Sequence, residues 1–158
     1  MADLASLLLA LGISGEMHPW GHVATEGQYA PVSIDWKHGV ENWNPSTNID
    51  PRHKTEGYAA GFNIQDKIAQ GLQGNDLELS MRLANALFKL GYLGGVKPSQ
   101  TLGDPALIEQ SSGNKYTKSL LGASALFDLW KSQNPQSNFD LSFITPNGSP
   151  GLLGTLHF

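Results

Sequence analysis

Glycine and proline set the strongest limit on what this chain can fold into. Its 158 residues include 18 glycines and 9 prolines, and many of them lie between apolar segments. Because both residues interrupt regular structure, we expect short helices and hairpins joined by loops. A chain of this length suits one domain and buries about 68–70% of its unfolded surface. The sequence therefore predicts a single globular body that is rich in loops.

Charge and cysteine content exclude several classes of function. Ten basic residues against fourteen acidic ones give a formal net charge of −4, and the basic residues are scattered along the chain. A nucleic-acid backbone is bound by a concentrated basic patch, so we expect no nucleic-acid partner. The chain has no cysteine, which rules out disulfides, thiolate metal sites and cysteine nucleophiles.

The apolar run from Leu4 to Ile13 is the one candidate for a targeting segment. It follows Asp3 without a basic stretch, and it is shorter than the roughly 20 residues that a membrane span needs. We therefore expect no signal peptide and no membrane span, and a location in the cytoplasm or within a viral particle. The run is interpreted as a buried or docking helix.

Apolar periodicity, capping residues and helix stops predict about five helices. They cover residues 2–11, a segment that begins at 16 or 17, and residues 56–72, 76–91 and 116–132. Gly12 is expected to end the first helix, and Pro19 restricts the second because proline is tolerated only in a first turn. Thr55 is expected to cap the third helix and Asn75 the fourth. The connection 94–113 is expected to be irregular, with one turn of helix at 104–110.

Two stretches alternate between apolar and polar residues and predict β-hairpins. The first places Val32, Ile34 and Trp36 on one face and lies between the second and third helices. The second comprises residues 139–143 and 152–158 around the turn sequence 146–151. The predicted fold class is mostly α (α+β), with a helical domain at residues 1–133 and a C-terminal hairpin arm at 134–158.

His18 and His22 are the first candidates for a metal site. Residues four apart lie on the same face of a helix, with about 6 Å between their Cβ atoms, so one ion can reach both rings. A zinc site needs at least one further ligand. The candidate is Glu56, which is expected to open the third helix, and Glu26 is an alternative because it is aligned with the histidines at spacings of four and eight.

The stretch His18-Pro19-Trp20-Gly21-His22, a hairpin, and then Glu56-Gly57-Tyr58-Ala59 together resemble the gluzincin group of zinc metallopeptidases. That family places two histidines in a His-Glu-x-x-His helix and takes a third ligand from a Glu-x-x-Ala helix. The resemblance spans residues 14–62 and implies zinc bound by His18, His22 and Glu56. At the position of the family's general base, the glutamate that takes a proton from the metal-bound water, this chain has Pro19.

Simpler explanations remain open for the same residues. A histidine pair at this spacing arises often in a chain with five histidines, and the helix dipole favours an acidic residue such as Glu56 in a first turn. Gly57 and Gly61 are expected to allow close packing of helices. Four further side chains are candidates to polarise a metal-bound oxygen: His38, Tyr58, Tyr92 and Tyr116.

Pro19 favours a protein without catalytic activity. We expect a structural or interaction protein on a metallopeptidase-like scaffold with a vestigial metal site, such as a component of a phage virion or cell-entry assembly. The alternative is an active zinc-dependent peptidase or hydrolase with a displaced general base. The C-terminal arm is expected to bind a protein partner or a second copy of the chain through six large apolar side chains. These are Phe139, Leu141, Phe143, Leu153, Leu156 and Phe158.

Overall fold

The computed structural model describes residues 3–35, 37, 40–43, 48–72, 76–94 and 104–158. Within this part of the chain it contains five α-helices and two antiparallel hairpins, which confirms the predicted, mostly helical class. The helices are α1 (Leu4–Glu26), α2 (Pro51–Gly71), α3 (Asp76–Leu93), α4 (Asp104–Ser112) and α5 (Thr117–Gln133). The strands are β1 (Val32–Asp35), β2 (Val40–Trp43), β3 (Phe139–Ile144) and β4 (Gly151–Leu156).

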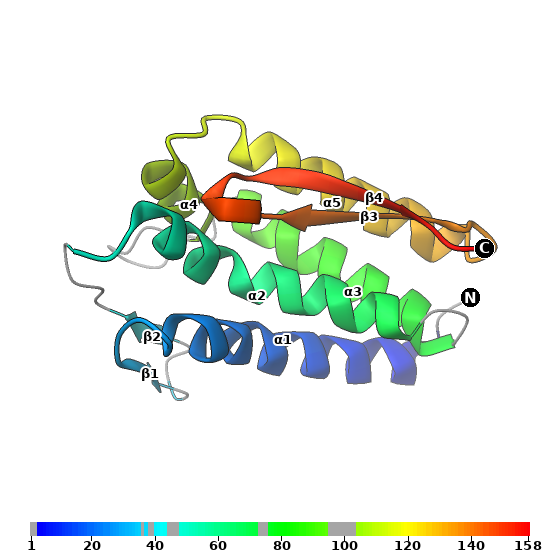
Figure 1. Ribbon diagram of the computed structural model, residues 1–158. Coiled ribbons are helices and arrows are strands. Elements are labelled where there is room, and N and C mark those ends of the chain that lie inside the picture. Colours follow the sequence, from blue (N-terminus) through cyan, green and yellow to red (C-terminus); the bar gives the residue numbers. More distant parts are fainter. Residues whose placement is uncertain (1–2, 36, 38–39, 44–47, 73–75, 95–103) are drawn as a thin grey trace.

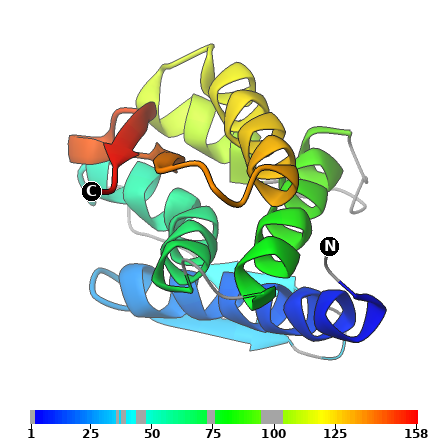
Figure 2. The same cartoon turned by 90° about the vertical axis from the view of Figure 1, so that its right-hand side faces the viewer.

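The elements form three layers, which are clearest when Figures 1 and 2 are compared. α1 and the β1–β2 hairpin make the first layer, and α2 and α3 make the second. The third contains α4, α5 and the β3–β4 hairpin. α2 contacts α1, α3, α4 and β3, so this central helix holds the layers together.

α1 is one continuous helix, and the prediction of two helices separated at Gly12 is wrong. Gly12 and Pro19 both lie in its interior. Asp3 caps the helix by accepting a hydrogen bond of 2.8 Å from the Ser6 backbone N–H. An interior glycine costs about 1 kcal/mol and a proline about 3 kcal/mol. The helix nevertheless persists, because it packs against both α2 and α3.

α2 begins earlier than predicted. Its first residue is Pro51, and the Asp50 carboxylate caps it by accepting a hydrogen bond of 2.8 Å from the Arg52 backbone N–H. Proline is favoured at the first helical position because its missing N–H would have no partner there. Thr55, the predicted cap, donates its hydroxyl to the Pro51 carbonyl instead. Glu56 therefore lies in the second turn of α2 and not at its start.

The remaining elements agree more closely with the sequence. α5 lies within one residue of its predicted bounds, and the β1–β2 hairpin is confirmed, with Val32 paired to Trp43 and Asp35 to Val40. α3 continues past Gly91 to Leu93. α4 has nine residues, more than the single turn predicted. The predicted cap Asn75 and the strand residue Trp36 lie outside the described residues. None of the described helices is long and apolar enough to cross a membrane.

The C-terminal hairpin packs on the helical body. β3 contacts both α2 and α5, and Phe143 is fully buried in a cluster with Phe62 and Leu121. Neighbouring strand residues point to opposite faces, so the burial of both Ser142 and Phe143 shows that this end of β3 is covered on both faces. Phe143 is therefore not available to a partner, which corrects one of the six predicted partner-binding residues.

The other five predicted partner-binding residues are more accessible. Leu141 is half-buried. Phe139, Leu153, Leu156 and Phe158 are exposed. A docking role for residues 134–158 stays a prediction.

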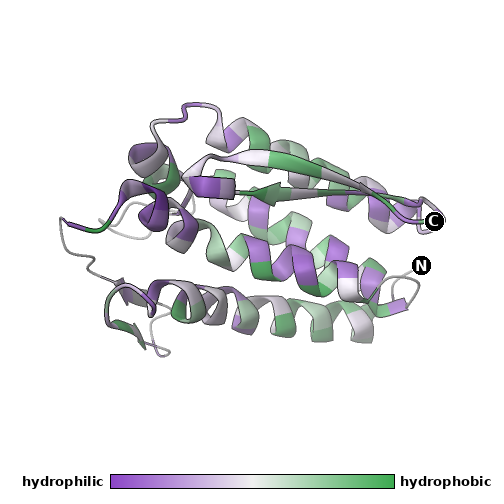
Figure 3. Cartoon of the chain, in the orientation of Figure 1, coloured by the Kyte–Doolittle hydropathy of each residue, from purple (hydrophilic) through white to green (hydrophobic). Residues whose placement is uncertain are grey.

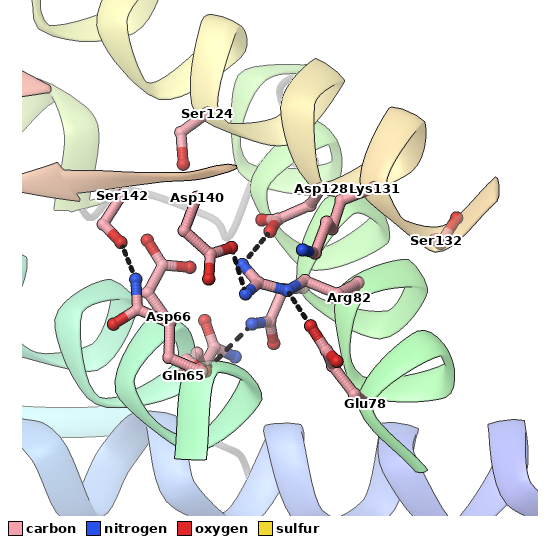
Figure 4. A network of polar contacts seen from close by, with 12 residues as sticks. Gln65, Asp66, Glu78, Arg82, Ser124, Asp128, Lys131, Ser132, Asp140 and Ser142 are labelled. Atoms are coloured by element: carbon pink, nitrogen blue, oxygen red, sulfur yellow. Dashed lines mark hydrogen bonds and ion pairs between the residues drawn. The ribbon is translucent and has the colours of Figure 1, made fainter. Parts of the chain in front are cut away.

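Charged side chains are buried where α2, α3, α5 and β3 meet (Figure 4). Arg82 bonds to Asp140 and, at 3.2 Å, to Asp128. Lys89 donates to Asp66 at 2.5 Å and to Asp128 at 2.6 Å. Figure 3 shows the hydrophilic segments of α2 and α3 in this central layer. Burying a charged side chain without a partner of opposite charge is costly. The network therefore holds these four elements in the arrangement that keeps every charge paired.

Phe143→Ala is expected to lower the free energy of unfolding by about 3–5 kcal/mol, because truncating a buried phenylalanine leaves a cavity. The control is Leu156→Ala on the paired strand, where the side chain is 61% exposed and the loss should be about 0.5 kcal/mol or less. Urea denaturation measures both. Equal losses would show that the hairpin is not part of the core.

The buried network also predicts a pH dependence of stability. Burial has the largest effect on the pKa of the Asp66 carboxyl and raises it. The positive charge of Lys89 lowers this pKa and the negative charge of Asp128 raises it, and the net result is a rise from 3.8 to about 6. The folded state therefore keeps a proton that the unfolded chain has lost, and this contribution to stability is full below pH 4 and disappears as pH rises through 6.

Asp66→Asn should remove this part of the pH profile, because the amide does not titrate. Urea unfolding from pH 4 to pH 7 measures the effect. As the pH rises from 4 to 7, the free energy of unfolding of wild type should fall relative to that of the variant. A constant offset between two parallel profiles would contradict the raised pKa.

Candidate metal centre

A buried polar ridge runs along α1. Ser14, His18, His22 and Glu26 follow one another at every fourth residue, and none is more than 6% exposed. Side chains four apart lie on one face of a helix, so all four side chains of this polar ridge face the other helices. Buried polar groups need hydrogen-bond partners, and the partners here come from α2, α3 and α4.

Two glycines of α2 bring the helices close together at this ridge. A Cβ atom at Gly61 would lie 2.5 Å from the His18 ring, and one at Gly57 would lie 2.8 Å from Cγ of Glu26. Both distances are shorter than real Cβ contacts, so only glycine fits without a shift. The prediction that Gly57 and Gly61 allow close helix packing is confirmed.

His18 and His22 meet Asp104, the first residue of α4. Each offers one ligand atom, and these atoms lie within 4.8 Å of one another. The Nε2 atom of His18 is 3.0 Å from Oδ2 of Asp104 and 3.3 Å from Nε2 of His22. The Nε2 atom of His22 is 3.5 Å from the same Asp104 oxygen. This group could hold a metal ion.

Tyr92, near the end of α3, adds a fourth polar atom. Its hydroxyl is 3.2 Å from Nε2 of His18. The two rings are stacked, with centroids 5.2 Å apart and an angle of 26° between their planes. Phe62 packs edge-on against both rings. The centre is therefore polar where the four groups meet and apolar beside them.

The partners of His18 determine which of its nitrogens faces the centre. The Gln65 amide nitrogen donates to Ser14, at 3.0 Å to the carbonyl oxygen and 2.8 Å to the hydroxyl. The Gln65 amide oxygen is thus oriented to accept from Nδ1 of His18, at 3.3 Å. We therefore assign the ring hydrogen to Nδ1, which leaves the lone pair of Nε2 directed at Asp104.

His22 is oriented in the same way. Its Nδ1 atom is 3.0 Å from the Gly57 carbonyl oxygen, and a carbonyl only accepts, so Nδ1 carries the hydrogen. The fully buried carboxylate of Glu26 lies 3.2 Å from the same nitrogen. A carbonyl or carboxylate behind the outer nitrogen of histidine is the usual support of a metal ligand.

The charges of the centre follow from these assignments. Burial acts to raise the pKa of the Asp104 carboxyl, but hydrogen bonds from the inner nitrogens of His18 and His22 and positive charge on these rings outweigh it and lower that pKa below its ordinary range. The carboxyl is therefore ionised as long as a positive charge faces it. With the neutral tautomers assigned above, two imidazole lone pairs and the carboxylate oxygen lie within 3.5 Å of one another. Such atoms repel unless a positive charge lies between them, and a metal ion would supply it.

The structure brings together the predicted histidines but not the predicted glutamates. Glu56 is outside the group and lines a cavity of about 610 Å³ between α1, α2 and the C-terminal hairpin. Glu26 lies behind His22 and contacts Nδ1, not the nitrogen that faces the centre. Asp104 occupies the place expected for a third ligand. Gly57, the neighbour of Glu56 in α2, is the residue that faces His22, so Glu56 points to another side of the helix.

Sequence reasoning missed Asp104 as a ligand and did not single out Tyr92. Asp104 is 86 residues from His18 and follows a long glycine-containing connection, so no local spacing links the two. Of the candidate oxygen-polarising residues, Tyr92 lies at the centre, Tyr58 packs against Trp43, and Tyr116 is exposed. His38 is outside the described residues.

Comparisons with known proteins give no match. No family model fits the sequence, and no curated protein and no solved structure matches the chain. The resemblance to gluzincins stays a prediction.

Gly61→Ala is expected to lower the free energy of unfolding by about 1–3 kcal/mol, because the new methyl group must displace the His18 ring. Gly12→Ala is the matched control. It lies in the interior of α1, and a methyl group there would have nothing within 4 Å outside its own helix, so it should raise stability by up to about 1 kcal/mol. Urea denaturation distinguishes the two. Stabilisation by both substitutions would contradict the close approach of α1 and α2.

Proposed function

We propose that this protein binds one divalent transition-metal ion through His18, His22 and Asp104, and that the ion has a structural role. The observation that carries the proposal is the orientation of the two histidines. Both outer nitrogens are engaged, by Gln65 and by the Gly57 carbonyl, so both inner nitrogens present lone pairs toward the Asp104 carboxyl group.

The donor atoms favour zinc as the ion. Two imidazoles and a carboxylate are a common ligand set for Zn²⁺. Iron(II) and other first-row ions accept the same donors, so competition between metals is part of the test. Calcium and magnesium are disfavoured because they require oxygen ligands.

Burial supports a structural role. The side chains of His18 and His22 are 7% and 2% exposed, and that of Asp104 is 18% exposed. Structural zinc sites are closed, whereas catalytic sites keep a position open for water. An ion at this centre would tie the middle of α1 to the first residue of α4.

Hydrolysis is the alternative function, and the same ligand set is its only support. The residue after the first histidine is Pro19, which has no proton to exchange. Glu26 lies behind His22 and away from the side where the ligand atoms converge, and Glu16 is exposed. The proposal therefore keeps the non-catalytic prediction. A role in a virion or cell-entry assembly stays a prediction.

Titration of the metal-free protein with zinc, measured by isothermal titration calorimetry, tests the proposal. Wild type is expected to bind one ion per chain. Asp104→Asn and His22→Gln should each weaken binding by at least about 100-fold, since loss of even an outer partner of a ligand costs about 10–100-fold. Zinc at 100 times its Kd should also raise the free energy of unfolding of wild type by about 2.7 kcal/mol.

Glu56→Gln is the control, because it separates the site seen in the structure from the one expected by resemblance. It should bind zinc as wild type does. Weakening by Glu56→Gln but not by Asp104→Asn would contradict the proposed ligand set. Zinc-dependent cleavage of a denatured protein substrate by wild type would establish the hydrolase alternative instead.

A further inference from the structure

We infer that the Tyr92 oxygen is the fourth ligand of the metal and that it closes the coordination sphere. This inference rests on the proposed function, because it concerns the same ion. It goes beyond that function by assigning as a ligand a residue that the sequence offers only as one of four candidates to polarise a metal-bound oxygen. It also decides between a closed structural site and an open hydrolytic one.

Distances within the centre support a tetrahedral arrangement. With metal–ligand bonds of about 2.0–2.2 Å, a tetrahedron places neighbouring ligand atoms about 3.3–3.6 Å apart. The Nε2 atom of His18 is 3.0 Å from the Asp104 oxygen, 3.2 Å from the Tyr92 hydroxyl and 3.3 Å from Nε2 of His22. The distance from His22 to Asp104 is 3.5 Å. These distances are close to the edges of such a tetrahedron, so small shifts would place one ion between His18, His22 and Asp104 with the Tyr92 oxygen beside His18.

The surroundings of Tyr92 hold its oxygen in this position. Its ring stacks on His18, and Phe62 packs against the edges of both. Without a metal the phenol is placed to donate its hydrogen to Nε2 of His18, at 3.2 Å. When the ion binds, the O–H bond breaks, the oxygen becomes a phenolate ligand, and one proton leaves to solvent.

Tyr92 also lies on the more accessible side of the group. It is 38% exposed, whereas His18 and His22 are 6% and 2% exposed and the Asp104 side chain is 18% exposed. An ion would therefore enter from the side of Tyr92 and Asp104. With Tyr92 in place, four protein ligands surround the ion, and no coordination position remains for water or a substrate.

Spectra of the copper(II) and cobalt(II) forms test this inference. Phenolate bound to copper(II) gives a charge-transfer band in the visible range, which histidine and aspartate do not give. Wild type loaded with one equivalent of copper(II) should show this band. Tyr92→Phe should lose it while still binding one copper ion, and Tyr116→Phe, which changes an exposed tyrosine of α5's N-cap, should keep it.

Azide added to the cobalt(II) form tests closure of the site. The visible spectrum of wild type should not change, because no position is open. That of Tyr92→Phe should shift, because the missing phenolate leaves room for the anion.

The possible failures can be told apart. If wild type binds copper without a phenolate band and its cobalt form responds to azide, Tyr92 is not a ligand and the inference is overturned, while metal binding stands. If wild type binds no metal, the proposed function fails, and the inference fails with it. Both readouts are taken on wild type, so the test does not depend on how well Tyr92→Phe folds.

Discussion

The close approach of α1 to α2 is the constraint on which the rest of the structure depends. Gly57 and Gly61 have no side chains to separate the helices, so the Gly57 carbonyl reaches His22 and the His18 ring fits beside Gly61. With larger residues there, the polar ridge of α1 would be held away from its partners, and its histidines would be buried without hydrogen bonds. The same contact orients both rings and keeps α1 helical through Pro19.

The sequence predicts those parts of the fold that depend on neighbours along the chain. Both hairpins and α5 are recognisable because alternation and helical periodicity are local patterns. The helix end expected at Gly12 is wrong because helix propensity is weak compared with tertiary packing. The helix start expected at Thr55 is wrong because Asp50 and Pro51 provide a cap and a first turn earlier in the chain. The burial of Arg82 and Lys89 has no local signal either, since charged residues on a helix ordinarily face solvent. Their carboxylate partners lie on other elements.

The same distinction applies to the candidate site. His18 and His22 are four residues apart, so their meeting is a property of one helix. Asp104 joins them only because α4 packs against α2 and brings its first residue to the two histidines. Tyr92 is one of several equivalent tyrosines in the sequence. Only the three-dimensional arrangement of α1, α3 and α4 separates it from Tyr58.

The position of β3 in the core has a consequence for synthesis on the ribosome. A nascent chain that has emerged as far as the end of α5 already contains Arg82 and Asp128 but lacks Asp140, which completes the buried ion pairs. It also lacks Phe143, so the cluster around Phe62 stays open to water. We therefore expect the native packing of this domain to form only after β3 has left the ribosome, because domains generally fold as units.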